Sequence, residues 1–111
     1  MNVITKFLVM HGFASPEIKK DLGFEIMCKV EKLLPLPIDR VEEKQICAFK
    51  AIAVKALSKA EQICLKAHLE EMIDVYTVEG HVARSEEVYF DKHRHAYEEY
   101  ASALSSVMDQ D

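Results

Sequence analysis

Turn-forming residues are scarce in this chain, which has only three glycines and three prolines among its 111 residues. An all-β domain of this length needs many tight turns, and such turns are rich in glycine and proline. No Asn-Gly or Asp-Gly pair lies between alternating apolar segments, so the usual signal of a short β-hairpin is also missing. Helix-forming residues such as Ala, Leu, Glu and Lys dominate instead. The composition therefore argues against an all-β fold and favours helices.

The three cysteines, Cys28, Cys47 and Cys64, are far apart and form no C-x-x-C pair. An odd number of widely spaced cysteines is typical of reduced thiols rather than of a disulfide framework. The apolar segment 1–13 is interrupted by Lys6 and is too short to cross a bilayer. It also lacks the basic start and the small-residue cleavage site of a signal peptide. We therefore expect a soluble, cytoplasmic protein that does not bind a membrane.

Positive charge is in the minority, with 14 basic residues interleaved among 19 acidic ones and a net charge of −5. Proteins that bind a phosphate backbone usually present a basic face, so nucleic acid is a disfavoured partner. The basic residues that could form a local patch are Lys50, Lys55, Lys59 and Lys66, which we interpret as a solvated face. A nucleic-acid-binding regulator centred on the turn 57–61 remains an alternative hypothesis.

The usual catalytic and ligand motifs are absent from the sequence, including the Walker loop, the dinucleotide fingerprint, the EF-hand loop, the zinc finger and the kinase signature. Cys64, His68 and Glu71 do follow one another at helical spacing, and a thiol beside an imidazole and a carboxylate resembles a nucleophilic site. No glycine-rich loop or nucleophile elbow accompanies them to build an oxyanion hole. We therefore interpret Cys64 as a small core residue and expect neither a catalytic residue nor a cofactor.

A hydrophobic fraction of 50% is enough to build one core, so residues 1–111 are expected to form a single all-α domain, a compact bundle of four to five helices. The expected helices are about 2–12, 16–34, 40–57, 59–79 and 85–108, with an edge strand as the alternative for the first. Ser15 followed by Pro16 is a helix start signal, and Ser58 with Glu61 forms a full capping box. The Pro35-Leu36-Pro37 segment cannot continue a helix.

Several details of packing also follow from the pattern. In the helix 16–34 the expected buried stripe is Ile18, Leu22, Ile26, Val30 and Leu33. The helix 40–57, with Asp39 and Glu42 as a capping pair, is apolar on nearly all sides, so it is expected in the middle of the bundle. Gly80 is expected to end the helix 59–79, and Ser85 to begin the last one.

The segment 85–108 is the most informative part of the chain, because aromatic and small apolar residues recur in it at helical spacing among many charges. The apolar side of this helix is expected to hold Tyr89, His93, Ala96, Tyr97, Tyr100, Leu104 and Val107. Tyrosine suits both the edge of a core and a surface that a partner covers, since its ring is apolar and its hydroxyl is polar. The tyrosine-rich side of this helix is therefore either core or interface.

The charged side of the same helix offers a metal-binding alternative, because Asp91, His95 and Glu99 lie one turn apart, with Glu98 beside them. His68 or His81 from a neighbouring helix could complete such a site. Di-metal helical bundles use Glu-x-x-His pairs, and no histidine here has a glutamate three residues before it. A solvated face with the ion pairs Arg94–Glu98 and Asp91–His95 is the simpler interpretation.

These patterns together predict a non-enzymatic protein-protein interaction module, a small regulator, adaptor or inhibitor that binds a larger protein through its C-terminal helices. A homodimer is a further possible form of that binding, and a metal-binding helical enzyme is the competing hypothesis. The expected partner-binding residues are Tyr89, His93, Tyr97 and Tyr100, with Arg94 and Glu98 as charges at the rim.

Overall fold

The computed structural model describes residues 2–82 and 86–110, and in that part of the chain it contains five helices and no strand. The helices are α1 (Val3–Met10), α2 (Pro16–Leu33), α3 (Glu43–Ala56), α4 (Lys59–Val82) and α5 (Glu87–Met108). The predicted single-domain all-α bundle is confirmed. The predicted start of the last helix at Ser85 lies outside the described residues.

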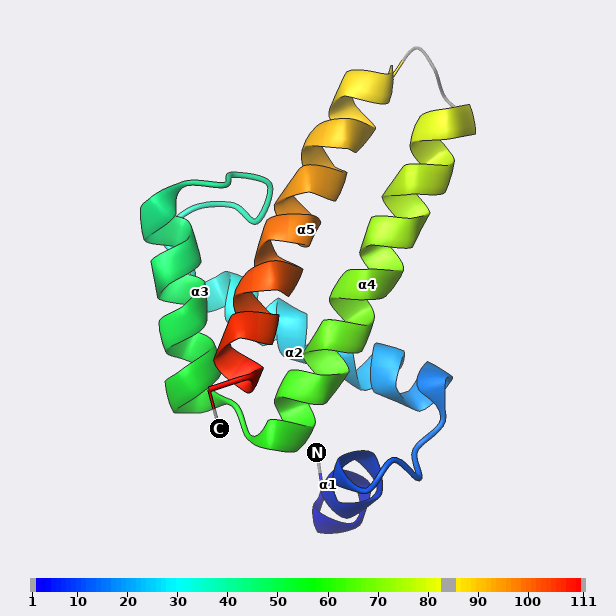
Figure 1. Cartoon of the computed structure of the whole chain (residues 1–111), viewed down its shortest axis with the longest axis vertical. Coiled ribbons are helices and arrows are strands. Elements are labelled where there is room, and N and C mark those ends of the chain that lie inside the picture. The colour runs from blue at the N-terminus through cyan, green and yellow to red at the C-terminus, as the bar shows by residue number, and fades with distance from the viewer. Residues whose placement is uncertain (1, 83–85, 111) are drawn as a thin grey trace.

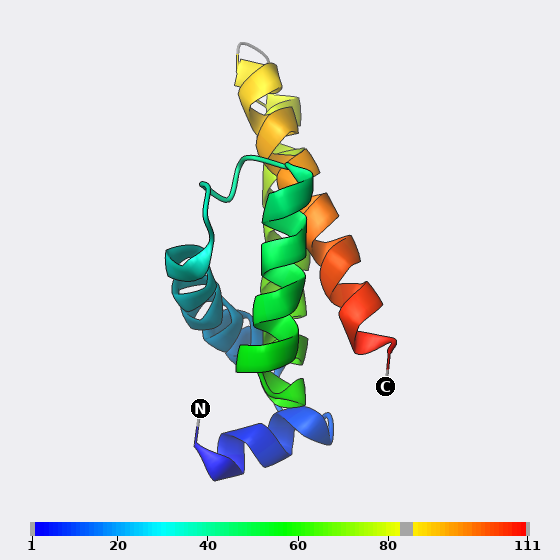
Figure 2. The same cartoon turned by 90° about the vertical axis from the view of Figure 1, so that its left-hand side faces the viewer.

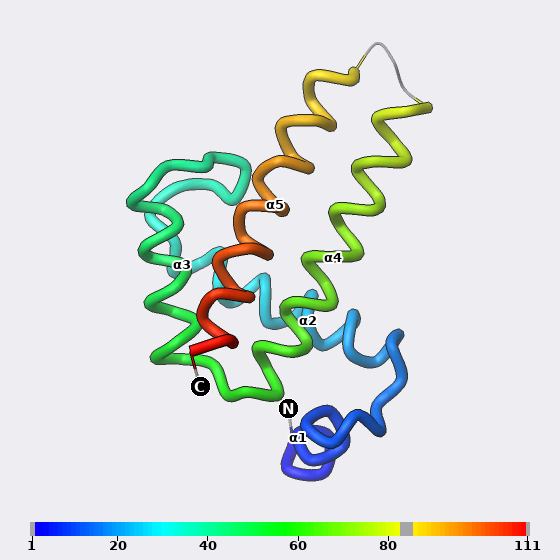
Figure 3. Tube along the Cα trace, viewed as in Figure 1, coloured from blue at the N-terminus to red at the C-terminus, as the bar shows by residue number. Residues whose placement is uncertain are grey.

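The two longest helices, α4 and α5, pack against each other as an antiparallel hairpin (Figure 1). α2 packs across α4, α3 packs beside α5, and α1 lies against the beginning of α4 (Figures 1 and 2). The hairpin runs along the longest dimension of the molecule, which measures 45 × 30 × 23 Å. α1 lies near one end of this long axis, and the last turn of α4 with the first turn of α5 lies at the other (Figure 3).

The central helix is α4, which contacts α1, α2 and α5. The prediction that α3 occupies the middle of the bundle is wrong, since α3 buries only one face, with Gln45, Phe49 and Ala53. Cys47 and Val54 on its other side are exposed. A helix with small and apolar side chains on all sides can therefore lie at the edge of a bundle, where neighbouring helices cover only one of its faces.

The predicted helix starts at Ser15 and Ser58 are confirmed. Ser15 Oγ accepts a hydrogen bond from the backbone N–H of Ile18 (3.2 Å). The Ser58 N–H donates to Glu61 Oε1 (3.0 Å), and the Glu61 N–H donates to Ser58 Oγ (3.2 Å). Burial alone would raise the pKa of Glu61, but the hydrogen bonds with Ser58 lower it below its usual range.

Two predicted helix ends are wrong. The capping pair of Asp39 and Glu42 does not form, because α3 begins at Glu43 and Glu42 takes the N-cap position without a side-chain hydrogen bond. Gly80 does not stop α4, which continues to Val82. A Cβ atom at Gly80 would lie 3.5 Å from Cβ of Phe90, an ordinary van der Waals contact, so this glycine faces α5 within the continuing helix.

The connection between α2 and α3 is fixed by the buried side chain of Gln45, which the sequence analysis did not single out. Gln45 Oε1 accepts a hydrogen bond from the N–H of Leu36 (3.0 Å), and Nε2 donates to the carbonyls of Leu36 and Pro37. These bonds satisfy backbone groups that the two prolines leave outside regular structure. The Pro35-Leu36-Pro37 segment is therefore held against the start of α3.

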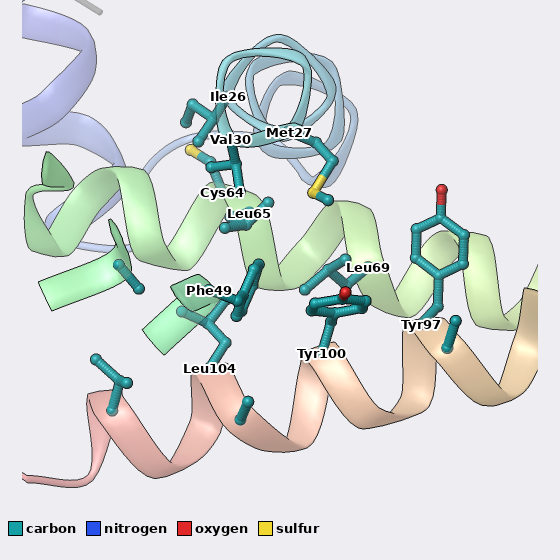
Figure 4. Close-up of a cluster of buried hydrophobic side chains, with 14 of the residues drawn as sticks. Ile26, Met27, Val30, Phe49, Cys64, Leu65, Leu69, Tyr97, Tyr100 and Leu104 are labelled. Carbon is teal, nitrogen blue, oxygen red and sulfur yellow. The ribbon is translucent and has the colours of Figure 1, made fainter. Parts of the chain in front are cut away.

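The core lies between the hairpin and the helices that cover it, and Figure 4 shows its central side chains. They come from all four long helices and include Ile26, Met27, Val30, Phe49, Cys64, Leu65, Leu69, Tyr97, Tyr100 and Leu104. The buried stripe predicted for α2 is partly wrong, because Ile18 and Leu33 are exposed. α2 crosses α4 (Figure 3), and the described contacts bury its middle while Ile18 and Leu33 near its two ends stay exposed.

Gly23 lies at this crossing and allows the two helices to approach closely. A Cβ atom at position 23 would lie 2.7 Å from Cβ of His68 and would collide with the backbone carbonyl of Cys64. Real side chains do not tolerate such contacts, so any larger residue would push α2 away from α4. Gly23 is a poor helix former within α2, yet its lack of a side chain is what allows α2 to cover α4.

Candidate protein-binding surface

The two halves of the α4–α5 hairpin differ in how they are covered. The half near the beginning of α4 and the end of α5 is covered by α2 and α3 and contributes most of the buried residues. In the other half, which we call the hairpin end and define as residues 74–82 of α4 and 87–93 of α5, no described residue is buried. The hairpin end projects beyond α2 and α3 (Figure 1).

Two of the predicted partner-binding residues, Tyr97 and Tyr100, belong to the core. Tyr100 is fully buried, its ring packs edge-on against Phe49 with centroids 4.8 Å apart, and its hydroxyl donates to the Arg40 carbonyl (3.3 Å). Tyr97 is 7% exposed and stacks on Tyr76 at 5.6 Å. Burial raises the pKa of both phenols. Their rings are therefore not available to a partner in the folded chain.

Tyr89 and His93 are the predicted residues that reach the surface at the hairpin end. Tyr89 is 55% exposed, and its ring lies against His93 with centroids 4.2 Å apart. His93 also packs on Tyr76 (5.3 Å), and its Nδ1 donates to the Tyr89 carbonyl (2.8 Å). The half-buried histidine thus supports an exposed tyrosine ring, a residue type in which protein interfaces are enriched.

Arg94 and Glu98 lie on a different side of α5. The Arg94 guanidinium is 3.6 Å from Glu98 and 3.5 Å from Asp91, so the predicted Arg94–Glu98 pair forms and Arg94 also pairs with Asp91. Arg94 and Asp91 line a shallow groove of about 240 Å³ together with residues of α4 and α5, namely Thr77, Gly80, His81 and Glu87. The six predicted partner-binding residues thus divide between the core and two sides of α5.

The residues of the metal-binding alternative do not converge. Asp91 pairs with Arg94, whereas His95 lies 4.0 Å from Glu99. Among the described residues no group of three histidines, cysteines or carboxylates is placed to hold a metal ion. His68 is buried under α2, against Phe24, far along α4 from His81. This arrangement gives no support to a metal centre in the described part of the chain.

The Cys64–His68 pair is enclosed in the core. Cys64 is fully buried, and burial raises the pKa of its thiol, which disfavours the reactive thiolate. Burial likewise lowers the pKa of His68, although nearby Glu71 opposes that shift. A buried thiol beside a buried neutral imidazole packs as core, in agreement with the interpretation of Cys64 from its sequence.

The lysines of the nucleic-acid alternative are spread over α3 and the first half of α4. Lys50 and Lys66 are half-buried, whereas Lys55 and Lys59 are exposed. The turn between α3 and α4 is tied by the Ser58 capping box, so its backbone groups are engaged within the chain. The hairpin end lies at the opposite end of α4 from this turn (Figure 1).

An exposed valine stripe on α4, consisting of Val75, Val78 and Val82, was missed by the sequence analysis as a surface. The three residues are 42%, 61% and 77% exposed, and their spacing of three and four residues places them on one side of the helix. His68, Val75 and Val82 are seven residues apart, so the stripe continues the face of α4 that α2 covers. The sequence signal was the spacing itself, which predicts an apolar face but not what covers it.

Acidic side chains border this valine stripe. Val75 and Val78 line a shallow, largely apolar depression of about 280 Å³ together with Asp74 and Glu79. The wider charge distribution agrees, because residues 69–111 hold 11 acidic and 3 basic residues, whereas residues 1–68 hold 8 acidic and 11 basic ones. The net charges are −8 and +3, so the hairpin end belongs to a strongly acidic part of an otherwise weakly charged molecule.

Comparisons with protein-family models, with curated proteins and with solved structures found no match for this chain. Among the described residues, the helices are all too short or too polar to cross a bilayer. The assignment of function therefore depends on the surface of the molecule itself.

Proposed function

We propose that this chain is a non-enzymatic protein-binding module that contacts its partner through the hairpin end. The contact surface consists of the valine stripe on α4 together with Tyr89 and His93 on α5. The observation that carries the proposal is the exposure of this apolar surface, with Val78 at 61% and Tyr89 at 55%, on helices that are packed and ordered by their other halves. Exposed apolar side chains gathered at one end of a rigid element are typical of interaction sites.

The acidic border indicates the chemistry of the partner. Asp74 and Glu79 flank the valines, and the part of the chain that contains them carries a net charge of −8. Complementary charge accelerates association and selects among partners, whereas apolar contact supplies most of the affinity. The partner is therefore a protein whose contact surface has an apolar centre and basic residues around it, as in a small regulator, adaptor or inhibitor that covers part of a larger protein.

The experiment is a comparative pull-down from the native host with quantitative mass spectrometry, using Val78→Asp and, as matched control, Val54→Asp. Both valines are exposed to nearly the same extent, 61% and 58%, but Val54 lies on α3. A genuine partner is retained by the wild type and by Val54→Asp and is lost with Val78→Asp. Its retention also weakens as salt is raised from 50 to 500 mM, because the basic and acidic rims are screened.

The proposal fails if every captured protein binds Val78→Asp and Val54→Asp equally well. It also fails if a protein is lost with Val78→Asp but binds equally well at high salt and binds an Asp74→Lys, Glu79→Lys double variant as well as it binds the wild type. The first result would mean that the valine stripe is not a contact surface. The second would mean that the charge argument for a basic partner is wrong.

A further inference from the structure

The first helix exposes a second apolar surface at the opposite end of the molecule. Its members, Val3, Ile4, Phe7, Met10 and Phe13, are between 55% and 83% exposed. Four of them follow the spacing of one side of α1, and Phe13 lies just beyond its end. Val9 on the opposite side is buried at 1%, so α1 packs on the body through one face and presents a second apolar face to its surroundings.

The conformation of this surface is fixed by the way α1 ends. Gly12 adopts a φ of 76°, the left-handed conformation that glycine reaches without strain. The Phe13 N–H donates to the Leu8 carbonyl (2.7 Å), and the Gly12 N–H donates to the Val9 carbonyl (3.2 Å). These two bonds form a Schellman motif, which holds Phe13 beside the helix. His11 lies between Phe7 and Phe13, with ring centroids 4.4 and 6.4 Å away.

The size of this surface fits a dimer. The five exposed residues present on the order of 700 Å² of surface, most of it apolar, close to the roughly 800 Å² that each partner of a standard interface buries. Lys6 and His11 are the only ionisable side chains on segment 2–13, and Lys6 interacts electrostatically with Glu61 of its own chain. Pairing two copies of α1 therefore buries apolar area while bringing few charges together.

A membrane surface is a poorer occupant than a second copy. Helices that lie in a membrane interface carry a strongly basic polar face opposite the apolar one. The face of α1 opposite its exposed side carries Val9 instead and is packed against the protein. The one basic residue of Val3–Met10 is Lys6, which interacts with Glu61.

We propose that two copies of the chain associate through the exposed face of α1, related by a twofold axis. Each copy then contributes the same residues, Val3, Ile4, Phe7, Met10 and Phe13, to one shared apolar centre. Because α1 and the hairpin end lie near opposite ends of the long axis (Figure 1), this pairing leaves both hairpin ends free and directed away from the dimer centre. The dimer is thereby bivalent, and a partner with repeated sites binds it with increased avidity.

Sedimentation velocity over a concentration range from about 1 to 500 μM tests the pairing, a range that brackets micromolar to submillimolar dissociation constants. The wild type is expected to convert from one chain to two, whereas Phe7→Asp stays a single chain throughout. Val54→Asp, which places the same charge on an exposed apolar position of α3, is expected to dimerise as the wild type does. Far-ultraviolet circular dichroism checks that each variant keeps its helices.

A second measurement does not depend on a charged variant. The chain has no tryptophan, so Phe13→Trp introduces a single fluorescent reporter into the exposed face. Its emission is expected to shift to the blue as concentration rises through the dimer transition, since the indole leaves water. In the Phe13→Trp, Phe7→Asp double variant the emission stays red-shifted at every concentration.

Three outcomes would overturn the proposal. A wild type that remains a single chain at the highest concentration, with unshifted emission, would show that the surface does not pair. A mass that grows beyond two chains would indicate head-to-tail contact. A blue shift that appears only with vesicles of anionic lipid would identify a membrane as the occupant. None of these measurements involves the hairpin end, so dimerisation and partner binding can fail separately.

Discussion

The two halves of the α4–α5 hairpin contain similar residues but differ in burial. In the covered half, Tyr97 and Tyr100 of α5 and His68 of α4 are buried; in the hairpin end, Tyr89 is 55% exposed and Val75 is 42% exposed. The residues on α4 even share one face, since Val75 follows His68 by seven positions. The difference comes from α2 and α3, which cover one half and leave the other. Whether the apolar side of an amphipathic helix is buried or exposed is thus decided by its neighbours.

The largest loss of stability is expected when a buried side chain is removed from the covered half. Tyr100→Ala should lower the free energy of unfolding by about 3–5 kcal/mol, because it removes a fully buried ring and leaves a cavity beside Phe49. Tyr100→Phe keeps the ring and removes the hydroxyl, which donates to the Arg40 carbonyl and also interacts with the Gln45 side chain, so its cost should be about 1 kcal/mol. Urea denaturation followed by circular dichroism measures both. Equal losses for the two variants would show that the hydroxyl, not the ring, dominates.

A smaller effect is expected from pH through His68, which α2 covers. Burial lowers the pKa of His68 below its usual 6.5, so below that pH the unfolded chain binds a proton more readily than the folded one. The contribution to stability is therefore complete above pH 6.5 and decreases as the pH falls toward the folded pKa. The slope for one proton is at most about 1.4 kcal/mol per pH unit.

Denaturation of the wild type and of His68→Leu at pH 7.5, 6.5 and 5.5 measures this contribution. The wild type should lose stability across the range, and the difference between the two proteins should shrink or reverse as the pH falls. Glu61 has a lowered pKa and titrates at a lower pH than this range, so it contributes little here. A wild type that gains stability relative to His68→Leu on acidification would contradict the burial of a neutral imidazole.

The sequence predicted those features of the fold that depend only on neighbouring residues, such as helix caps. Ser15 and Ser58 cap their helices as predicted, because a hydroxyl near free N–H groups needs no distant partner. Gly23 and Gly80 were less predictable, since each faces another helix, and only at Gly23 is the approach too close for a side chain. Gln45 was missed for the same reason, because its hydrogen-bond partners are nine and eight residues away in an irregular loop.

The candidate site was predictable only as a pattern. Helical spacing indicated that Tyr89, Tyr97 and Tyr100 share one side of α5, but not that Tyr89 stays exposed while the other two are buried. The same spacing indicated an apolar face through Val75 on α4, yet exposure at Val78 and Val82 depends on where α2 crosses. Periodicity encodes which face is apolar, whereas the extent of its coverage is a property of tertiary packing.

The smallest effect on stability is expected at the hairpin end. Tyr89→Ala removes a ring that contacts only Phe90 and His93 among the described aromatic residues, so the free energy of unfolding should change by no more than about 0.5 kcal/mol. Urea denaturation of Tyr89→Ala and Tyr100→Ala side by side compares the same substitution in the uncovered and the covered half of α5. A loss above about 2 kcal/mol would mean that Tyr89 is part of the core. If Tyr89→Ala leaves the free energy of unfolding unchanged but weakens retention of the partner, the ring contributes to partner binding and not to the stability of its own fold.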